Sequence, residues 1–169
     1  NTFTEINEKE LAELILAEET LQVTFTGGEP LLQESSLKDV ISEIIDKKSV
    51  SIETNGSLSI RKLRAAFPQI YFSLDWKTPS SGNTFFEIEN LAFIKERGWI
   101  KFVVGNKEDL DFVREKILQI DTNSIPVIIS PVFEKDPAWF TTVSDFIMNS
   151  FPAENVRLQI QLHKIIGVE

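Results

Sequence analysis

Residues 22–30 read QVTFTGGEP, and this stretch decides what kind of fold the chain adopts. Its first part, Gln22 to Phe25, contains β-branched and aromatic residues and predicts a short strand. Gly27 and Gly28 then predict a sharp turn, because glycine reaches backbone conformations that other residues avoid. Neither glycine has a Cβ, so a ligand can approach the backbone, and Glu29 beside them offers a carboxylate that accepts from an ammonium group.

The rest of the chain alternates between helical and β-prone segments. Apolar residues at helical spacing predict helices at 8–17, 37–45, 60–66, 85–97, 107–118 and 139–148, and short apolar runs predict strands at 22–25, 49–53, 70–74, 100–104, 126–129 and 156–162. The acids at 107–111 are typical of the positive end of a helix. Strand–helix alternation indicates right-handed βαβ units and a parallel sheet. We therefore predict an α/β fold, a partial (βα) barrel of about six mostly parallel strands, as a single domain over residues 1–169.

Polar or glycine-containing segments follow four of the predicted strands. They are Gly27 to Glu29, Glu53 to Ser57, Ser73 to Lys77, and Ser130 to Phe133. The carboxyl ends of parallel strands meet at one edge of the sheet, where such folds bind their ligands. Any one of these segments is also typical of an ordinary turn. The four together predict a ligand site at that edge.

Composition excludes several classes of function. The net charge of −9 argues against a general nucleic-acid binder, which needs clustered Lys and Arg. The sequence has no apolar run of about 20 residues and no basic-then-apolar leader, so we expect a cytoplasmic protein without a membrane partner. It has no Cys, which excludes a disulfide framework or a Cys-ligated metal within these residues.

Five segments together resemble one enzyme family. They are TGGEPLLQ (26–33), ETNGS (53–57), SLDWKTPSSG (73–82), KFVVG (101–105) and QLHKIIG (161–167). Gly-Gly-Glu-Pro after a strand is typical of the radical S-adenosylmethionine superfamily, and the other segments resemble its 7-carboxy-7-deazaguanine synthases, lyases of queuosine and deazapurine biosynthesis. The resemblance implies a fold of the radical S-adenosylmethionine type. It also implies an enzyme that converts 6-carboxy-5,6,7,8-tetrahydropterin to 7-carboxy-7-deazaguanine with loss of ammonia.

The resemblance also implies which residues form the site, without assigning a catalytic residue or a metal ligand. The residues expected around S-adenosylmethionine are Gly28, Glu29, Ser73, Asp75, Lys77, Ser130, Pro131, Val132 and Phe133. Those expected at the pterin substrate are Thr26, His163 and the terminal Glu169. A lone His is more often structural than functional. In the predicted strand at 156–162, however, the apolar residues alternate with Arg157, Gln159 and Gln161, so His163 would face the interior cavity.

The family's reaction further implies a [4Fe–4S] cluster with three Cys ligands, and Mg²⁺. In the family these ligands precede Gly-Gly-Glu, whereas this sequence begins at Asn1. Either the cluster-bearing segment lies upstream, which we favour, or the protein lacks radical chemistry. A reductant such as flavodoxin and a homodimer are also implied. The alternatives are a glycyl-radical-enzyme activating protein, which shares Gly-Gly-Glu-Pro, and a cluster-free module that binds a nucleoside or pterin.

Overall fold

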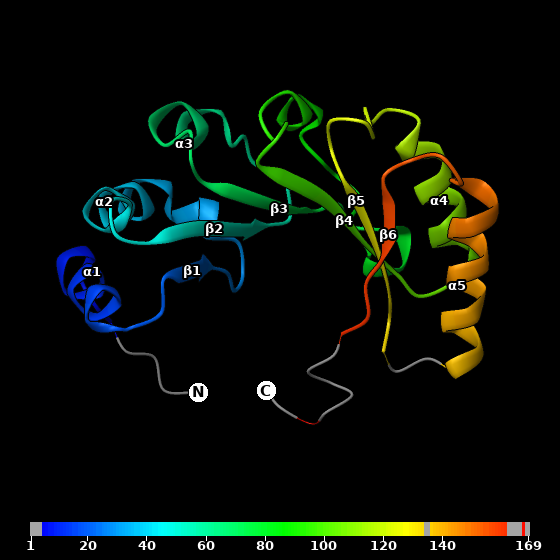
Figure 1. Cartoon of the computed structure of the whole chain (residues 1–169), viewed down its shortest axis with the longest axis horizontal. Coiled ribbons are helices and arrows are strands. Elements are labelled where there is room, and N and C mark those ends of the chain that lie inside the picture. Colours follow the sequence, from blue (N-terminus) through cyan, green and yellow to red (C-terminus); the bar gives the residue numbers. More distant parts are fainter. Residues whose placement is uncertain (1–4, 134–135, 162–166, 168–169) are drawn as a thin grey trace.

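The computed structural model describes residues 5–133, 136–161 and 167. Its centre is one sheet of six strands in the order β1-β2-β3-β4-β5-β6, and every neighbouring pair is parallel. The strands are β1 (Gln22–Phe25), β2 (Ser49–Thr54), β3 (Tyr71–Asp75), β4 (Gly98–Val104), β5 (Val127–Pro131) and β6 (Val156–Leu158). Figure 1 shows the sheet curving into an arch that does not close. The predicted α/β partial barrel is confirmed.

The helices lie along the outer side of this arch (Figure 1). The α-helices are α1 (Glu8–Ala17), α2 (Glu34–Ile44), α3 (Arg61–Ala66), α4 (Lys107–Ile117) and α5 (Pro137–Ser150). Three short 3-10 helices, η1 (Pro30–Gln33), η2 (Pro79–Ser81) and η3 (Ile88–Ala92), lie in the connections. Among the described residues, no helix combines the length and the apolar character that crossing a membrane requires.

Alternation along the strands divides the sheet into an apolar and a polar face. Side chains such as Ile52, Phe72 and Phe102 are fully buried and form the core beneath the helices. Successive residues of a strand point to opposite faces, so the residues between them point to the inner side of the arch. Many of those inner residues are polar: Thr24, Ser51, Glu53, Ser73, Asp75 and Lys101. A parallel sheet that keeps a polar inner face is built to surround a ligand rather than to fill a core.

The predicted helix at 85–97 is wrong. This segment contains only the 3-10 helix η3 and a Glu96 residue with a φ of 68°. Tertiary contacts outweigh the helical pattern, because Asn90 is fully buried and its amide donates to Gly56 O at 3.2 Å and Leu58 O at 2.9 Å. Its carbonyl oxygen accepts from Ile60 N at 3.0 Å. The segment therefore fastens the loop that follows β2 instead of forming a regular helix.

The last strand is shorter than predicted. β6 ends at Leu158. Leu158 and Ile160 are 37% and 44% exposed and are not core residues, whereas Val156 packs against the core. The ladder to β5 stops for a chemical reason. In a parallel pair, every second residue of β5 donates its backbone N–H to β6. Val127 N donates to Asn155 O at 2.9 Å, and the next donor positions along β5 are Ile129 and then Pro131. Proline has no backbone N–H, so the pairing cannot continue past that point.

Candidate functional site

A polar cavity of about 280 Å³ lies toward the carboxyl edge of the sheet, lined by residues at the ends of β1, β2 and β3 and by Lys101 from within β4. Its lining residues are Thr26, Gly27, Gly28, Glu53, Thr54, Asn55, Ser73, Asp75, Lys77 and Lys101. The first three follow β1, the next three end β2, and the rest belong to β3, its following loop and β4. The structure therefore brings together three of the four predicted polar segments, as the rule for parallel sheets requires.

The two glycines after β1 have left-handed backbone conformations, with φ values of 91° at Gly27 and 57° at Gly28. A Cβ built on either glycine would meet no atom of the protein within 4 Å. Glycine is thus needed here for its conformation and not for packing within the protein. The open space above this turn is compatible with a ligand lying directly on the backbone.

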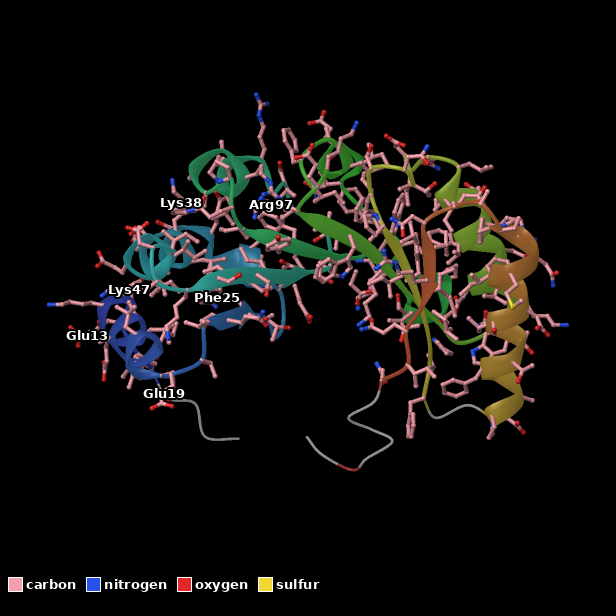
Figure 2. All side chains as sticks on the ribbon, viewed as in Figure 1. Glu13, Glu19, Phe25, Lys38, Lys47 and Arg97 are labelled. Carbon is pink, nitrogen blue, oxygen red and sulfur yellow. The ribbon has the colours of Figure 1, made fainter. Side chains whose placement is uncertain are left out.

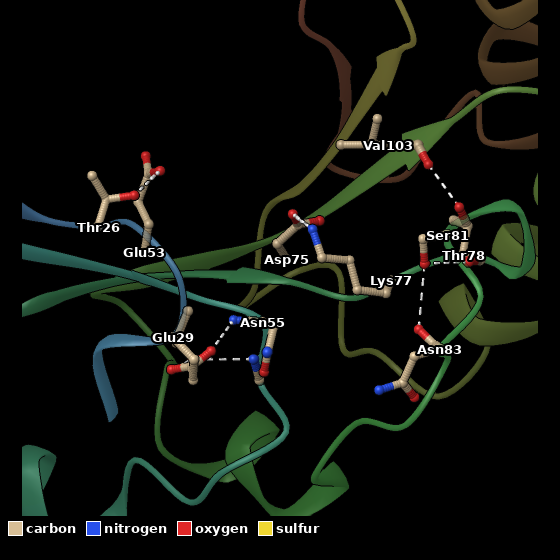
Figure 3. A network of polar contacts seen from close by, with 12 residues as sticks. Thr26, Glu29, Glu53, Asn55, Asp75, Lys77, Thr78, Ser81, Asn83 and Val103 are labelled. Atoms are coloured by element: carbon tan, nitrogen blue, oxygen red, sulfur yellow. Dashed lines mark hydrogen bonds and ion pairs between the residues drawn. The ribbon is translucent and has the colours of Figure 1, made fainter. Parts of the chain in front are cut away.

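Glu29 links the β1 turn to the end of β2. Its Oε1 accepts from Leu31 N at 3.1 Å and from Thr54 Oγ1 at 2.6 Å, and its Oε2 accepts from Asn55 N at 2.8 Å (Figure 3). A carboxylate has about four lone-pair sites, so one acceptor position on Oε2 stays available to an ammonium group. Glu29 itself does not line the cavity, but it holds Thr54 and Asn55, which do.

Asp75 and Lys77 form an ion pair at the centre of the rim. Lys77 Nζ donates to Asp75 Oδ2 at 2.5 Å, and the two side chains are 42% and 25% exposed (Figure 3). Asp75 Oδ1 is buried and has no hydrogen-bond partner within the described part of the chain. On the β1 side of the cavity, Thr26 Oγ1 donates to Glu53 Oε2 at 3.3 Å. The cavity thus has the ammonium–carboxylate pair of Lys77 and Asp75 on one wall and the hydroxyl–carboxylate pair of Thr26 and Glu53 on the opposite wall.

A second cavity, of about 260 Å³, shares Asp75 and Lys77 with the first. Its other lining residues are Thr78, Ser80, Ser81, Val103 and Val132. The loop between Lys77 and Ser81 is held from below, since Thr78 Oγ1 donates to Val103 O at 2.8 Å. The Asp75–Lys77 pair therefore borders two adjoining spaces, one polar and one with apolar walls.

Asp109 holds this loop in place, a role that the sequence alone does not predict beyond an ordinary helix start. The side chain is fully buried and accepts from Ser80 N at 2.9 Å, Ser80 Oγ at 2.7 Å and Gly105 N at 2.7 Å. Burial raises the pKa of the Asp109 carboxyl, but hydrogen bonds from Ser80, Gly105 and Thr78 outweigh this effect and hold the pKa below its usual range. Asp109 stays ionised and joins the loop after β3 to the loop after β4.

Known proteins with similar sequences carry one name. The 7-carboxy-7-deazaguanine synthase of Methanospirillum hungatei is 34% identical over 97% of this chain and 66% of its own length. The corresponding proteins of Clostridium acetobutylicum and Thermoplasma acidophilum are each 36% identical, over 97% and 85% of this chain and over 74% and 66% of their own lengths. The chain belongs to the 7-carboxy-7-deazaguanine synthase family. It spans about two thirds of the length of these relatives, as the 66% and 74% figures show.

Solved structures support the fold. The structure of Streptococcus suis SuiB bound to S-adenosylmethionine matches 95% of this chain and 45% of its own, with a TM-score of 0.65 and 16% identity. Another structure of SuiB matches 92% of this chain and 43% of its own, with the same TM-score. No protein-family model matches the chain.

Of the residues that the resemblance implies around S-adenosylmethionine, those at 130–133 are only partly gathered at the rim. Val132 lines the second cavity, whereas Ser130 and Pro131 are buried in β5 and line neither cavity. Ser130 Oγ has no hydrogen-bond partner among the described residues. Phe133 is half-buried in the turn after β5. His163 and Glu169, predicted at the substrate, lie outside the described residues.

The residues present fit S-adenosylmethionine better than they fit a metal centre. The open backbone above Gly27 and Gly28 and the free acceptor position on Glu29 suit a ligand with an ammonium group. A [4Fe–4S] cluster needs thiolate ligands, and the sequence has no Cys. Within the described ranges, no group of three His, Cys, Asp or Glu side chains could hold a metal ion. The cluster therefore has no ligands in this sequence, and the described residues offer no three-ligand site for Mg²⁺.

Proposed function

We propose that this chain provides the S-adenosylmethionine-binding wall of an enzyme that converts 6-carboxy-5,6,7,8-tetrahydropterin to 7-carboxy-7-deazaguanine with loss of ammonia. The observation that carries this proposal is the cavity at the strand ends. Thr26, Gly28, Ser73, Asp75 and Lys77, expected at the site from the family resemblance, all line it. The names of the relatives supply the product, and the family resemblance supplies the substrate and the loss of ammonia.

Each wall of the cavity has a defined task in this proposal. S-adenosylmethionine, when bound, supplies a 5′-deoxyadenosyl radical as the reactive species. The turn at Gly27 and Gly28 and the carboxylate of Glu29 receive its amino group, because they combine an open backbone with a free acceptor. Ser73, Asp75 and Lys77 offer a hydroxyl, a carboxylate and an ammonium group for the ribose and methionine. Val132 gives the second cavity an apolar wall against which an adenine ring can pack.

The protein's contribution is therefore position and electrostatics, while the cofactor carries the difficult chemistry. Thr26 Oγ1 and Glu53 lie on the opposite wall from Lys77, where a pterin ring with several donors and acceptors can bind. We further propose that a [4Fe–4S] cluster and Mg²⁺ are held by residues outside this sequence, that a flavodoxin-like protein supplies electrons, and that the enzyme is a cytoplasmic homodimer.

The test uses the product of the complete gene. Iron and sulfide are reconstituted anaerobically, and S-adenosylmethionine, reductant, Mg²⁺ and the carboxypterin are supplied. We expect 7-carboxy-7-deazaguanine by mass spectrometry. If a cluster forms and S-adenosylmethionine is cleaved without this product, the substrate assignment is wrong, and an activating enzyme becomes the better description. If no cluster forms, the radical mechanism is wrong, and binding of a pterin alone would indicate a cluster-free module.

A matched pair of variants connects this activity to the cavity. Asp75→Asn keeps the shape of the side chain but removes the charge that pairs with Lys77. Asp111→Asn removes a carboxylate on α4 that is 73% exposed and forms a surface ion pair with Arg114. We expect the first variant to weaken S-adenosylmethionine binding and the second to match the unmodified protein. Equal binding by both variants would remove the Asp75–Lys77 pair from the cofactor site.

A further inference from the structure

Lys101 is a cation in the middle of an otherwise apolar strand. The strand β4 reads GWIKFVV. The residues on either side of Lys101, Ile100 and Phe102, are fully buried beneath the helices. Alternation therefore points Lys101 to the inner face of the arch. There it lines the polar cavity together with Thr26, Glu53 and Asp75. The family resemblance assigned no role to this residue.

The ammonium group of Lys101 has no partner among the described residues. Asp75 is its cross-strand neighbour in the β3–β4 register, but Asp75 Oδ2 accepts from Lys77 at 2.5 Å, and the buried Oδ1 accepts from no described residue, Lys101 included. Glu53, the other acid of the cavity, accepts from Thr26 at 3.3 Å. Within the part of the chain that the structure describes, no side chain forms a hydrogen bond or an ion pair with Lys101.

The head of the Lys101 side chain is accessible from the cavity. Lys101 is half-buried, but its Nζ is not among the buried side-chain atoms that lack a partner. A lysine commonly buries its apolar stem and leaves its ammonium group in water. A ligand that brings an acceptor into the cavity can therefore reach this cation.

We propose that Lys101 binds the carboxylate of a ligand in this cavity. The inference rests on the proposed function, because that function supplies two ligands that carry a carboxylate, S-adenosylmethionine and the carboxypterin. A lysine ammonium and a carboxylate form a charge-assisted hydrogen bond, which is about twice as strong as a neutral one. The Asp75–Lys77 pair is neutral as a unit, so Lys101 is the cation that remains available to such a group.

The experiment compares each ligand with its counterpart that lacks the carboxylate. The probes are S-adenosylmethionine, decarboxylated S-adenosylmethionine, 6-carboxy-5,6,7,8-tetrahydropterin and 5,6,7,8-tetrahydropterin, titrated anaerobically by calorimetry into the unmodified protein and Lys101→Met. Methionine keeps the length and the apolar stem of the side chain. We expect Lys101→Met to weaken one carboxylate ligand by about tenfold to a hundredfold and to leave its decarboxylated counterpart unchanged. The affected ligand identifies the source of the carboxylate.

Two control variants separate charge from structure. Lys101→Arg keeps the positive charge and should retain most of the affinity. Lys38→Met removes an exposed ammonium from α2 on the outer side of the arch, where Figure 2 labels it, and should bind as the unmodified protein does. If Lys101→Met binds all four probes with the affinity of the unmodified protein, the inference is wrong. It is also wrong if the affinity for a carboxylate ligand and for its counterpart without the carboxylate falls by the same factor. If the unmodified protein binds none of the four, the proposed function fails as well.

Discussion

Asp109 offers the most direct test of how the rim of the cavity is held. Asp109→Asn replaces a buried carboxylate with an amide of the same shape. One carboxylate oxygen accepts from Ser80 N, and the other accepts from both Ser80 Oγ and Gly105 N. An amide has one acceptor oxygen, and its NH₂ group must face one of these two sets of donors. In either orientation a backbone N–H, of Ser80 or of Gly105, loses its acceptor.

The expected cost follows from that count. A buried donor left without a partner costs about 1–3 kcal/mol, and the remaining hydrogen bonds lose the strength that the charge gave them. We therefore expect Asp109→Asn to lower the free energy of unfolding by about 2 kcal/mol. Asp109→Ala, which removes every acceptor, should lower it by about 4 kcal/mol. Urea unfolding followed by circular dichroism measures both, since the midpoint shifts in proportion to the loss of stability.

Asp111→Asn is the control, because its side chain is on the same helix but is 73% exposed and pairs only at the surface with Arg114. A surface ion pair is worth at most about 1 kcal/mol, so this variant should unfold close to the unmodified midpoint. Should Asp109→Asn unfold no earlier than Asp111→Asn, the hydrogen bonds to Ser80 and Gly105 do not hold the loop, and the reasoning fails.

Three further predictions concern the same rim. Because the pKa of Asp109 is lowered in the folded protein, its contribution to stability is complete above the unfolded pKa of about 3.9 and is lost as the pH falls toward the folded pKa. Urea midpoints measured from pH 6 to pH 3 should therefore fall more steeply for the unmodified protein than for Asp109→Asn, and parallel curves would contradict this. Gly56→Ala should cost about 3 kcal/mol, because φ is 71° and the new Cβ would lie 2.3 Å from Phe86 Cε2. Gly82 has a φ of 83° but open space around its Cα, so Gly82→Ala should lower the free energy of unfolding by only about 1 kcal/mol. Equal losses of stability in the two variants would show that backbone strain, and not the contact with Phe86, sets the cost. Glu29→Ala should lower stability by about 2 kcal/mol as well as weaken S-adenosylmethionine binding, since three donors lose their acceptor; calorimetry and urea unfolding on the same sample separate the two effects.

The sequence predicts the sheet well, because parallel strands buried on one face and covered by helices leave a strong local pattern. The helix at 8–17 and the strand at 22–25 have the predicted ends. Failures occur where distant residues decide. Segment 85–97 has the apolar content of a helix, but Asn90 is drawn to the backbone of Gly56 and Leu58, more than thirty residues earlier. No local pattern contains that information.

The site shows the same division. Glycine at a strand end and polar residues after neighbouring strands predict the position of the cavity, because topology alone brings those ends together. The buried link at Asp109 escapes the sequence, since an acid in the first turn of a helix has an ordinary explanation in the helix dipole. Its partners, Ser80 and Gly105, belong to different loops, and only the fold shows that all three meet.

Three polar side chains, one half-buried and two buried, connect the loops at the rim in order from β1 to β4. Glu29 joins the turn after β1 to the end of β2, Asn90 joins the connection after β3 to the loop after β2, and Asp109 joins the loops after β3 and β4. Loops at the edge of a sheet are usually its most mobile parts, and ordering them on binding costs affinity. Here the cost is met during folding, because each link is a satisfied hydrogen-bond set inside the protein. Breaking one link should therefore loosen the loops on both sides of it. In Asp109→Asn, backbone amide hydrogen exchange should accelerate in the loops after β3 and β4, while the turn after β1 keeps its protection. Acceleration confined to α4 would show that Asp109 does not hold these two loops.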